Sequence, residues 1–296
     1  MDPNLTKQTI PVAVVIISYN TIALTRKALR ALYNSSVSPS QVIVVDNGSA
    51  DGSAAMVNVE FPRIRLVENE SNLGFAKANN QAIRNLVKEP FVWLLNSDTE
   101  VGKWSLEQLY HYVETHPKVG ALGPTLIYPD GSWQSVGGYF PTIMNVFSYL
   151  IPLTSLLPPS RRARLKNIAL FPQPIPPSGL DTDYVTGAAV MLRKKALDEV
   201  GLLAEDYFMY FEETDLCWRL ARAGWERRVI PTNPVTHVYG GSFKTKHDPR
   251  RLKFFLNSLN HFVKKNYRGF TKQIILVEVF LFGRLSVVIK QLKNIF

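Results

Sequence analysis

Residues 12–33 read VAVVIISYNTIALTRKALRALY, and this stretch decides the fold class. Residues 12–18 are apolar up to the closing serine and contain no polar alternation, which is typical of a strand buried on both faces of a sheet. Apolar residues then recur at helical spacing over 21–33. A buried strand followed directly by an amphipathic helix is the unit from which parallel α/β sheets are built.

The same alternation continues to about residue 125. It predicts further strands at 42–46, 64–68, 91–95 and 119–122, and further helices at 51–59, 75–87 and 103–115. Strands that alternate with helices predict right-handed crossovers and a mostly parallel central sheet flanked by helices. The sequence therefore predicts a Rossmann-like α/β fold, in which ligands bind beyond the carboxyl ends of the strands.

The pattern changes after about residue 124. An insertion is predicted at about 139–180, because this region holds an apolar stretch, a basic cluster and a proline-rich piece, at 140–157, 161–164 and 172–177. Shorter elements follow at 184–193, 197–201, 212–223, 229–230 and 235–239, and two closing helices at 249–267 and 270–293. We therefore predict a main domain over 1–243 and a helical C-terminal extension over 244–296.

The composition is that of an ordinary globular protein, with 296 residues, 46% apolar and 20% charged. The only cysteine, Cys217, excludes a disulfide framework and a thiolate metal cluster, and favours a reducing compartment. Residues 1–10 lack the basic region and apolar run of a signal peptide. A cytoplasmic location is expected.

The positive charge is confined to the C-terminal end. The net charge is +10, and residues 244–296 carry twelve Lys or Arg against two acids, Asp248 and Glu278. This charge accompanies the apolar run 274–289, which is shorter than the roughly 20 residues that cross a bilayer. The combination favours a helix on the inner face of the cell membrane over a nucleic-acid partner. A helix packed on the body with a solvated basic face is the alternative.

Polar residues follow four predicted strands at their carboxyl ends, in the clusters 18–20, 46–49, 72–80 and 96–99. These clusters should gather at one edge of the sheet, with room for a nucleotide. Asp46 could accept a hydrogen bond from an N–H of the nucleobase. A carboxylate at the end of a buried strand needs a cation or a donor, so Asp98 is a natural hard ligand for a divalent metal. Turn formation and helix capping explain Ser49, Asp51 and Ser53 more simply.

Neither a GxGxxG motif after the first strand nor a GxxxxGK[ST] motif is present in the sequence. Their absence disfavours a dinucleotide redox site and a P-loop phosphotransferase. A different acidic cluster occurs at 210–219, which reads YFEETDLCWR and enters a predicted helix near Glu212. The helix dipole alone favours acids there, and Asp215 can pair with Arg219. Glu213, with Glu212 as the alternate, is then the candidate general base for a hydroxyl.

His237 ends the Val/Thr-rich part of the strand predicted at 235–239. From its chemistry alone, it can either share a cation with Asp98 or be a satisfied structural histidine.

Together these residues resemble the inverting glycosyltransferases of family 2, which have the GT-A (nucleotide-diphospho-sugar transferase) fold. The resemblance covers about 11–243 and rests on IISYN at 16–20, VVDNGS at 44–49, DGS at 51–53, NLGFA at 72–76, LLNSD at 94–98, Gly187-Ala188, FMYFEETDL at 208–216, and His237 with Gly240 and Ser242. It implies a nucleoside-diphosphate sugar donor, Mg²⁺ or Mn²⁺, and a single displacement that inverts the sugar. Asp98 and His237 would hold the metal. The implied nucleotide-sugar site comprises Ser18, Tyr19, Asn20, Asp46, Asn72, Lys77, Asn96 and Ser97.

Two residues depart from the family pattern: Asn96 stands where the metal motif usually begins with Asp, and Glu213 where the acidic motif usually has Asp. The segment 210–217 is similar to bacterial rhamnosyltransferases of cell-wall and surface-polysaccharide assembly. This points to dTDP-rhamnose among the UDP- or dTDP-sugars that could serve as donor, and implies a glycan or polyprenyl-diphosphate-linked acceptor reached at the membrane.

Two other functions compete with this one. One is a catalytically inactive nucleotide-sugar-binding module, which the departures at Asn96 and Glu213 suggest. The other is a sugar nucleotidyltransferase, which would carry a glycine-rich basic loop after the first strand, where this chain has SYNT at 18–21.

Overall fold

The computed structural model describes residues 7–150, 158, 168–170, 172–238 and 249–293, with side chains in the last helix described to Gly283. The basic cluster 161–164 and the residues Gly240 and Ser242 lie outside the described residues. The chain forms an α/β fold whose strands are β1 (Thr9–Ser18), β2 (Ser38–Asp46), β3 (Arg65–Glu68), β4 (Phe91–Asn96), β5 (Thr99–Glu100), β6 (Val119–Gly123), β7 (Leu126–Ile127), β8 (Gly137–Gly138), β9 (Leu180–Asp181), β10 (Tyr184–Val185), β11 (Ala189–Arg193), β12 (Glu226–Val229) and β13 (Val235–His237).

The central sheet has the strand order β3-β2-β1-β4-β11-β6-β12-β9. The strands β3, β2, β1 and β4 are parallel neighbours, as the alternation with helices predicts. β11 lies between β4 and β6 and is antiparallel to both. The prediction of a mostly parallel sheet is confirmed. The sequence did not predict that an antiparallel strand, β11, lies between β4 and β6.

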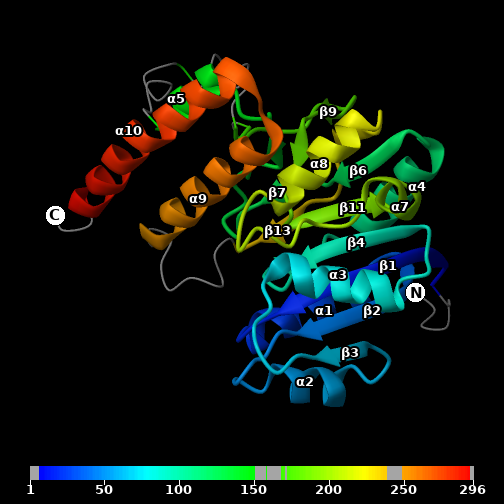
Figure 1. Ribbon diagram of the computed structural model, residues 1–296. Coiled ribbons are helices and arrows are strands. Elements are labelled where there is room, and N and C mark those ends of the chain that lie inside the picture. The colour runs from blue at the N-terminus through cyan, green and yellow to red at the C-terminus, as the bar shows by residue number, and fades with distance from the viewer. Residues whose placement is uncertain (1–6, 151–157, 159–167, 171, 239–248, 294–296) are drawn as a thin grey trace.

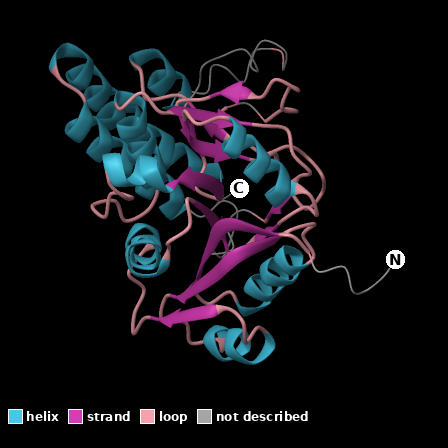
Figure 2. Cartoon of the chain, turned by 90° about the vertical axis from the view of Figure 1, so that its right-hand side faces the viewer, coloured by secondary structure: helices cyan, strands magenta, loops and turns pink. Residues whose placement is uncertain are grey.

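Helices cover both faces of the sheet (Figures 1 and 2). They are α1 (Ile22–Tyr33), α2 (Ser53–Glu60), α3 (Phe75–Leu86), α4 (Ser105–Thr115), α5 (Ile143–Leu150), α7 (Lys194–Val200), α8 (Glu212–Arg222), α9 (Pro249–Asn266) and α10 (Gly269–Lys293). Most predicted elements agree with these bounds to within a few residues. The strand predicted at 229–230 is wrong in position, because β12 ends at Val229, and the short strands β5, β7, β8, β9 and β10 were not predicted as separate strands.

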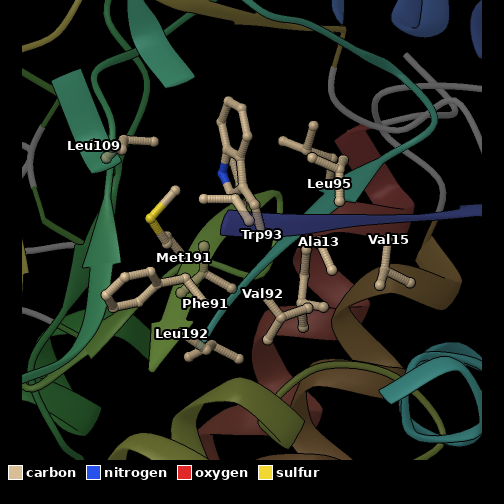
Figure 3. Close-up of a cluster of buried hydrophobic side chains, with 14 of the residues drawn as sticks. Ala13, Val15, Phe91, Val92, Trp93, Leu95, Leu109, Met191 and Leu192 are labelled. Carbon is tan, nitrogen blue, oxygen red and sulfur yellow. The ribbon is translucent and has the colours of Figure 1, made fainter. Parts of the chain in front are cut away.

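The main core lies between the sheet and these helices. Residues 12–16 of β1 are fully buried, as their unbroken apolar run predicts. They lie beside β4, whose Trp93 is also fully buried and pairs in register with Met191 of β11 (Figure 3). Burying apolar side chains contributes about 25 cal/mol per Å², so this dense centre holds the ends of β1 and β4 in fixed register.

A second core joins the C-terminal helices to the body. It contains Val146 of α5, Phe262 and Val263 of α9 and Ile275 of α10. Phe211, at the start of α8, packs into the same cluster. α5, α9 and α10 therefore gather at the end of the molecule away from β3 (Figure 1), in direct contact with the acidic segment. Among the described residues, no helix is long and apolar enough to cross a membrane.

Candidate active site

The register of the sheet brings the strand-end clusters to one edge. Ser18 pairs with Asp46 and Ile17 with Asn96, so β1, β2 and β4 end side by side. The Ser18 side chain is buried, and its hydroxyl lies 2.9 Å from that of Thr25. Thr21 links this pair to β4 by donating to Ser97 Oγ at 3.0 Å. Ser18 and Ser97 therefore hold the strand ends together through a buried hydroxyl network.

The loops after β1 and β2 brace one another. Asn20 has a left-handed φ of 52°, and its backbone N–H donates to Ser49 Oγ at 2.9 Å. Its side-chain oxygen accepts from the N–H of Ala50 at 2.8 Å. Asp51 accepts from the N–H groups of Ile22 and Ser53. The turn-forming role expected of Ser49, Asp51 and Ser53 is confirmed, but the N-cap residue of α2 is Gly52, which has no side chain to cap this helix.

The two carboxylate oxygens of Asp46 differ in their hydrogen bonding. Its Oδ1 accepts from the Ser49 N–H at 2.8 Å. Its Oδ2 is buried and has no hydrogen-bond partner among the described residues. Leaving a buried acceptor unpaired costs about 1–3 kcal/mol, and a ligand N–H would remove this penalty.

The 72–80 segment completes this part of the edge. Gly48 has a φ of 81°, and a Cβ on it would lie 2.7 Å from the Ser71 Cα, so only glycine lets the two loops approach this closely. Asn47 donates to Asn72 Oδ1 at 2.9 Å. The side chains of Lys77, on α3, and Tyr19 are exposed. The structure thus brings Ser18, Asn20 and Asn72 together around Asp46.

Asp98 and His237 meet although 139 positions of chain separate them. Asp98 lies in the turn between β4 and β5, and β5 pairs antiparallel with β13 so that Thr99 faces His237. The Val238 N–H donates to the Asp98 carbonyl at 3.0 Å. As a result, Asp98 Oδ1 and His237 Nε2 lie 3.2 Å apart, with both side chains buried.

Gln134, which no sequence motif indicated, contacts the other ring nitrogen of His237. Its Oε1 lies 3.0 Å from His237 Nδ1, and its amide nitrogen donates to the His237 carbonyl. Gln134 lies outside every predicted strand end, so only its contact with β13 identifies it.

Glu212 and Glu213 begin α8 after two residues in the left-handed region, Tyr210 at φ 66° and Phe211 at φ 71°. Burial raises the pKa of Glu213 to about 7. Burial and the charge of Glu213 raise the pKa of Glu212 well above its ordinary value. The Oε2 atom of each has no hydrogen-bond partner among the described residues. Glu212 is the more deeply buried of the two, so Glu213 is better placed to meet a ligand.

Gly187-Ala188 lies between the end of β4 and the base candidate. The Asn96 N–H donates to the Ala188 carbonyl at 2.9 Å. A Cβ on Gly187 would lie 3.9 Å from Glu213 Cβ and 3.5 Å from the Phe75 ring. The ends of β4 and the starts of α3 and α8 therefore converge on this dipeptide.

Asp215 has a structural role. It is fully buried, and its carboxylate meets Arg219 at 2.9 Å and Lys265 of α9 at 3.2 Å. Tyr207 donates to the same carboxylate at 3.3 Å, and burial raises the pKa of this tyrosine above its usual range. The pairing of Asp215 with Arg219 predicted from the sequence is confirmed, and the link to α9 is an addition.

We expect Asp215→Leu to lower the free energy of unfolding by about 3 kcal/mol, because Arg219 and Lys265 would lose their shared buried partner. Chemical denaturation would measure the loss. Asp206→Asn is the matched control, since Asp206 is an exposed partner of the same Lys265 at 3.2 Å and should cost less than about 1 kcal/mol. Equal losses in the two variants would contradict the structural role of Asp215.

The comparisons with known proteins decide the family. Residues 13–201 match the family described as glycosyl transferase family 2. This chain belongs to glycosyl transferase family 2. The expected family and enzyme class are thereby confirmed, and the protein is a glycosyltransferase.

Among its relatives, the enzyme is 30% identical over 236 residues to the N-acetylglucosaminyl-diphospho-decaprenol L-rhamnosyltransferase of Mycobacterium tuberculosis, covering 76% of this chain and 75% of the relative. It is similar in fold to a mannosyltransferase from Pyrobaculum calidifontis solved with GDP-Man and Mn²⁺, with a TM-score of 0.58, 17% identity, and coverage of 95% of this chain and 73% of that one. The solved structure of GalNAc-T7 with UDP, GalNAc and Mn²⁺ gives a TM-score of 0.59 at 13% identity, covering 85% and 48% of the two chains. The GT-A fold is confirmed.

The donor set of the glycosyltransferase fits a divalent cation. A carboxylate oxygen and an imidazole nitrogen suit Mg²⁺ and Mn²⁺. Two ligands on adjacent octahedral positions of such an ion lie about 3 Å apart, given metal–ligand distances of about 2.1 Å. The Asp98–His237 separation of 3.2 Å agrees with this. Within the described part of the chain, no group of three or more His, Cys, Asp or Glu could hold a metal, so the remaining ligands would come from a diphosphate or water.

Proposed function

We propose that this glycosyltransferase moves a sugar from a nucleoside-diphosphate donor to an acceptor hydroxyl by single displacement, with Glu213 as the base. The observations that support the proposal are the buried Asp98–His237 pair and, beside Gly187, the Glu213 Oε2 atom, which has no hydrogen-bond partner among the described residues. A base and an anion-stabilising site on opposite sides of a reacting carbon are what an in-line displacement requires.

Each group has a defined task. Glu213 Oε2 accepts the proton of the acceptor hydroxyl, and the hydroxyl oxygen forms a bond to the anomeric carbon as the bond to the diphosphate breaks. Because no covalent intermediate forms, the configuration of the sugar inverts. Asp98 and His237 would hold Mg²⁺ or Mn²⁺, which, when bound, stabilises the charge that develops on the diphosphate. Asp46 Oδ2, which is buried and has no hydrogen-bond partner among the described residues, would accept from an N–H of the nucleobase.

The donor proposed is dTDP-rhamnose, supported by the M. tuberculosis relative, whose name specifies L-rhamnosyl transfer to a decaprenol-diphosphate-linked acceptor. A lipid-linked or glycan acceptor of cell-wall assembly is proposed on the same support. The exposed Phe208, in the loop that leads to Glu213, forms a ring pair with Phe254 of α9 at 5.2 Å. An apolar surface beside the base suits an acceptor that carries an isoprenoid chain.

A donor panel tests the proposal. dTDP-rhamnose, UDP-sugars and GDP-mannose would be scored for thermal stabilisation and hydrolysis, each with and without Mn²⁺. We expect one donor to stabilise the enzyme in the presence of metal and to be consumed, and the glycoside formed with an acceptor to have inverted configuration by NMR. Failure of every nucleotide sugar to bind, with or without metal, would overturn the enzyme function. Binding without turnover would favour an inactive binding module.

We also propose that α10 docks the enzyme on the inner face of the cell membrane. Phe270, Val277, Phe280 and Leu281 are each more than half exposed. The last three are spaced so that they share one helix face. Glu278 is buried on the inward side, where burial raises its pKa to about 7, so the apolar face carries no acid over its described length. Exposed Lys264 and Arg268 lie just before this helix and complement an anionic surface.

We expect the triple variant Val277→Ser, Phe280→Ser, Leu281→Ser to bind vesicles containing phosphatidylglycerol at least about tenfold more weakly, because buried apolar area drives interfacial binding. Co-sedimentation would measure it. Val59→Ser is the control, because Val59 on α2 is an exposed apolar side chain away from α10 (Figure 1), and this variant should bind like the wild type. Unchanged binding by the triple variant would exclude α10 as the docking face.

A further inference from the structure

The Gln134 side chain makes three contacts with other parts of the chain, two of them with the distant His237. Its Oε1 lies 3.0 Å from His237 Nδ1. Its Nε2 donates to the carbonyl oxygen of His237 and, at 3.2 Å, to that of Ile127 in β7. Both Gln134 and His237 are buried, and β7 and β13 are parallel neighbours. The carboxamide therefore ties together the two strands and the imidazole.

These contacts determine which end of the amide faces the ring. Carbonyl oxygens only accept hydrogen bonds, so the amide end that meets two of them must be the NH₂ group. The amide oxygen consequently faces His237 Nδ1. An amide oxygen only accepts, so Nδ1 must carry a hydrogen.

The orientation has a consequence for the opposite nitrogen. In a neutral imidazole one nitrogen carries the hydrogen and the other has the lone pair. With the hydrogen held on Nδ1, the lone pair is on Nε2, the atom 3.2 Å from Asp98 Oδ1. Neutral histidine in water prefers the reverse arrangement, with its hydrogen on Nε2, so the protein must select the tautomer.

We propose that Gln134 is the positioning residue that selects the Nδ1–H tautomer of His237 and thereby presents Nε2 to a divalent cation shared with Asp98. The inference rests on the proposed metal function. It assigns Gln134 no contact with substrate: the residue acts through the ring that it orients, as outer-shell partners of metal-binding histidines do.

The test uses the full-length enzyme with ¹⁵N-labelled histidine and two variants of similar shape. Gln134→Met removes every polar contact. Gln134→Glu keeps an acceptor for Nδ1 but loses the donors to the two carbonyls. The His237 tautomer would be read from ¹H–¹⁵N correlation spectra at a pH where the ring is neutral, with His237→Gln identifying its signals. The affinity for Mn²⁺, alone and with dTDP, would be measured by electron paramagnetic resonance.

We expect Nδ1–H in the wild type and in Gln134→Glu, and a shift toward Nε2–H in Gln134→Met. Mn²⁺ affinity should fall roughly 10–100-fold in Gln134→Met and stay within about threefold in Gln134→Glu. An unchanged tautomer in Gln134→Met, or an equal loss of Mn²⁺ affinity in both variants, would overturn the proposal. Gln134 would then have only the structural role of joining β7 and β13. If the wild type binds no Mn²⁺, the metal part of the proposed function fails, while the tautomer spectra still decide the role of Gln134.

Discussion

Glu213→Gln is expected to lower the rate of sugar transfer by about 10²–10⁴, the range that a positioned general base supplies. The change removes the proton acceptor and keeps the size of the side chain. Binding of the nucleotide sugar should persist, because Asp46 and the metal pair lie on other elements. Initial rates of transfer, together with thermal shifts by donor and Mn²⁺, would separate the two effects.

The pH profile provides an independent check on the same residue. Burial raises the pKa of Glu213 to about 7, so its carboxylate is present above this pH and is lost as the pH falls. We expect kcat/KM of the wild type to decline by up to tenfold per pH unit below about 7, and the residual rate of Glu213→Gln to lack this limb.

Two further variants control the assignment. Glu212→Gln makes the same change one residue away and should cost less than about tenfold, which is below the 10²–10⁴-fold range for a lost base. Glu213→Asp supplies the residue usual in the family and should retain part of the activity. A severe loss in Glu212→Gln with a mild one in Glu213→Gln would transfer the role of base to Glu212.

Asp98→Asn is expected to reduce metal-dependent transfer by roughly 10³-fold, because it removes the carboxylate of the Asp98–His237 pair and keeps the shape of the side chain. Mn²⁺ binding should weaken in parallel, as measured by titration with and without dTDP. The buried Asp98 backbone contact to Val238 does not depend on the side chain, so β5 and β13 should remain paired.

Glu100→Gln is the matched control for Asp98. Glu100 is a carboxylate on the same β5–β13 pair, where it faces Thr236 instead of His237. Its substitution should leave Mn²⁺ affinity and transfer near the wild-type level. Full activity of Asp98→Asn at saturating Mn²⁺ would show that this carboxylate is not required for the metal-dependent step.

The sequence alone determined the local elements and the polar edge of the sheet. The unbroken apolar run of β1 and the helical spacing of α1 are local patterns, because burial on two faces or on one stripe depends on residues close in the chain. Parallel strands that alternate with helices have their carboxyl ends at one edge of the sheet, so this topology by itself places Ser18, Asp46 and Asn96 together.

Only the tertiary structure decided how distant segments complete the site. The antiparallel β11 brings Gly187-Ala188 between Asn96 and Glu213, and no periodicity encodes that return of the chain. The difference between Glu212 and Glu213 comes from burial against packed helices, since the two residues are chemically identical neighbours. The contact of Gln134 with His237 follows only from the pairing of β7 with β13. These contacts depend on packing between elements far apart in the chain, which sequence spacing does not specify.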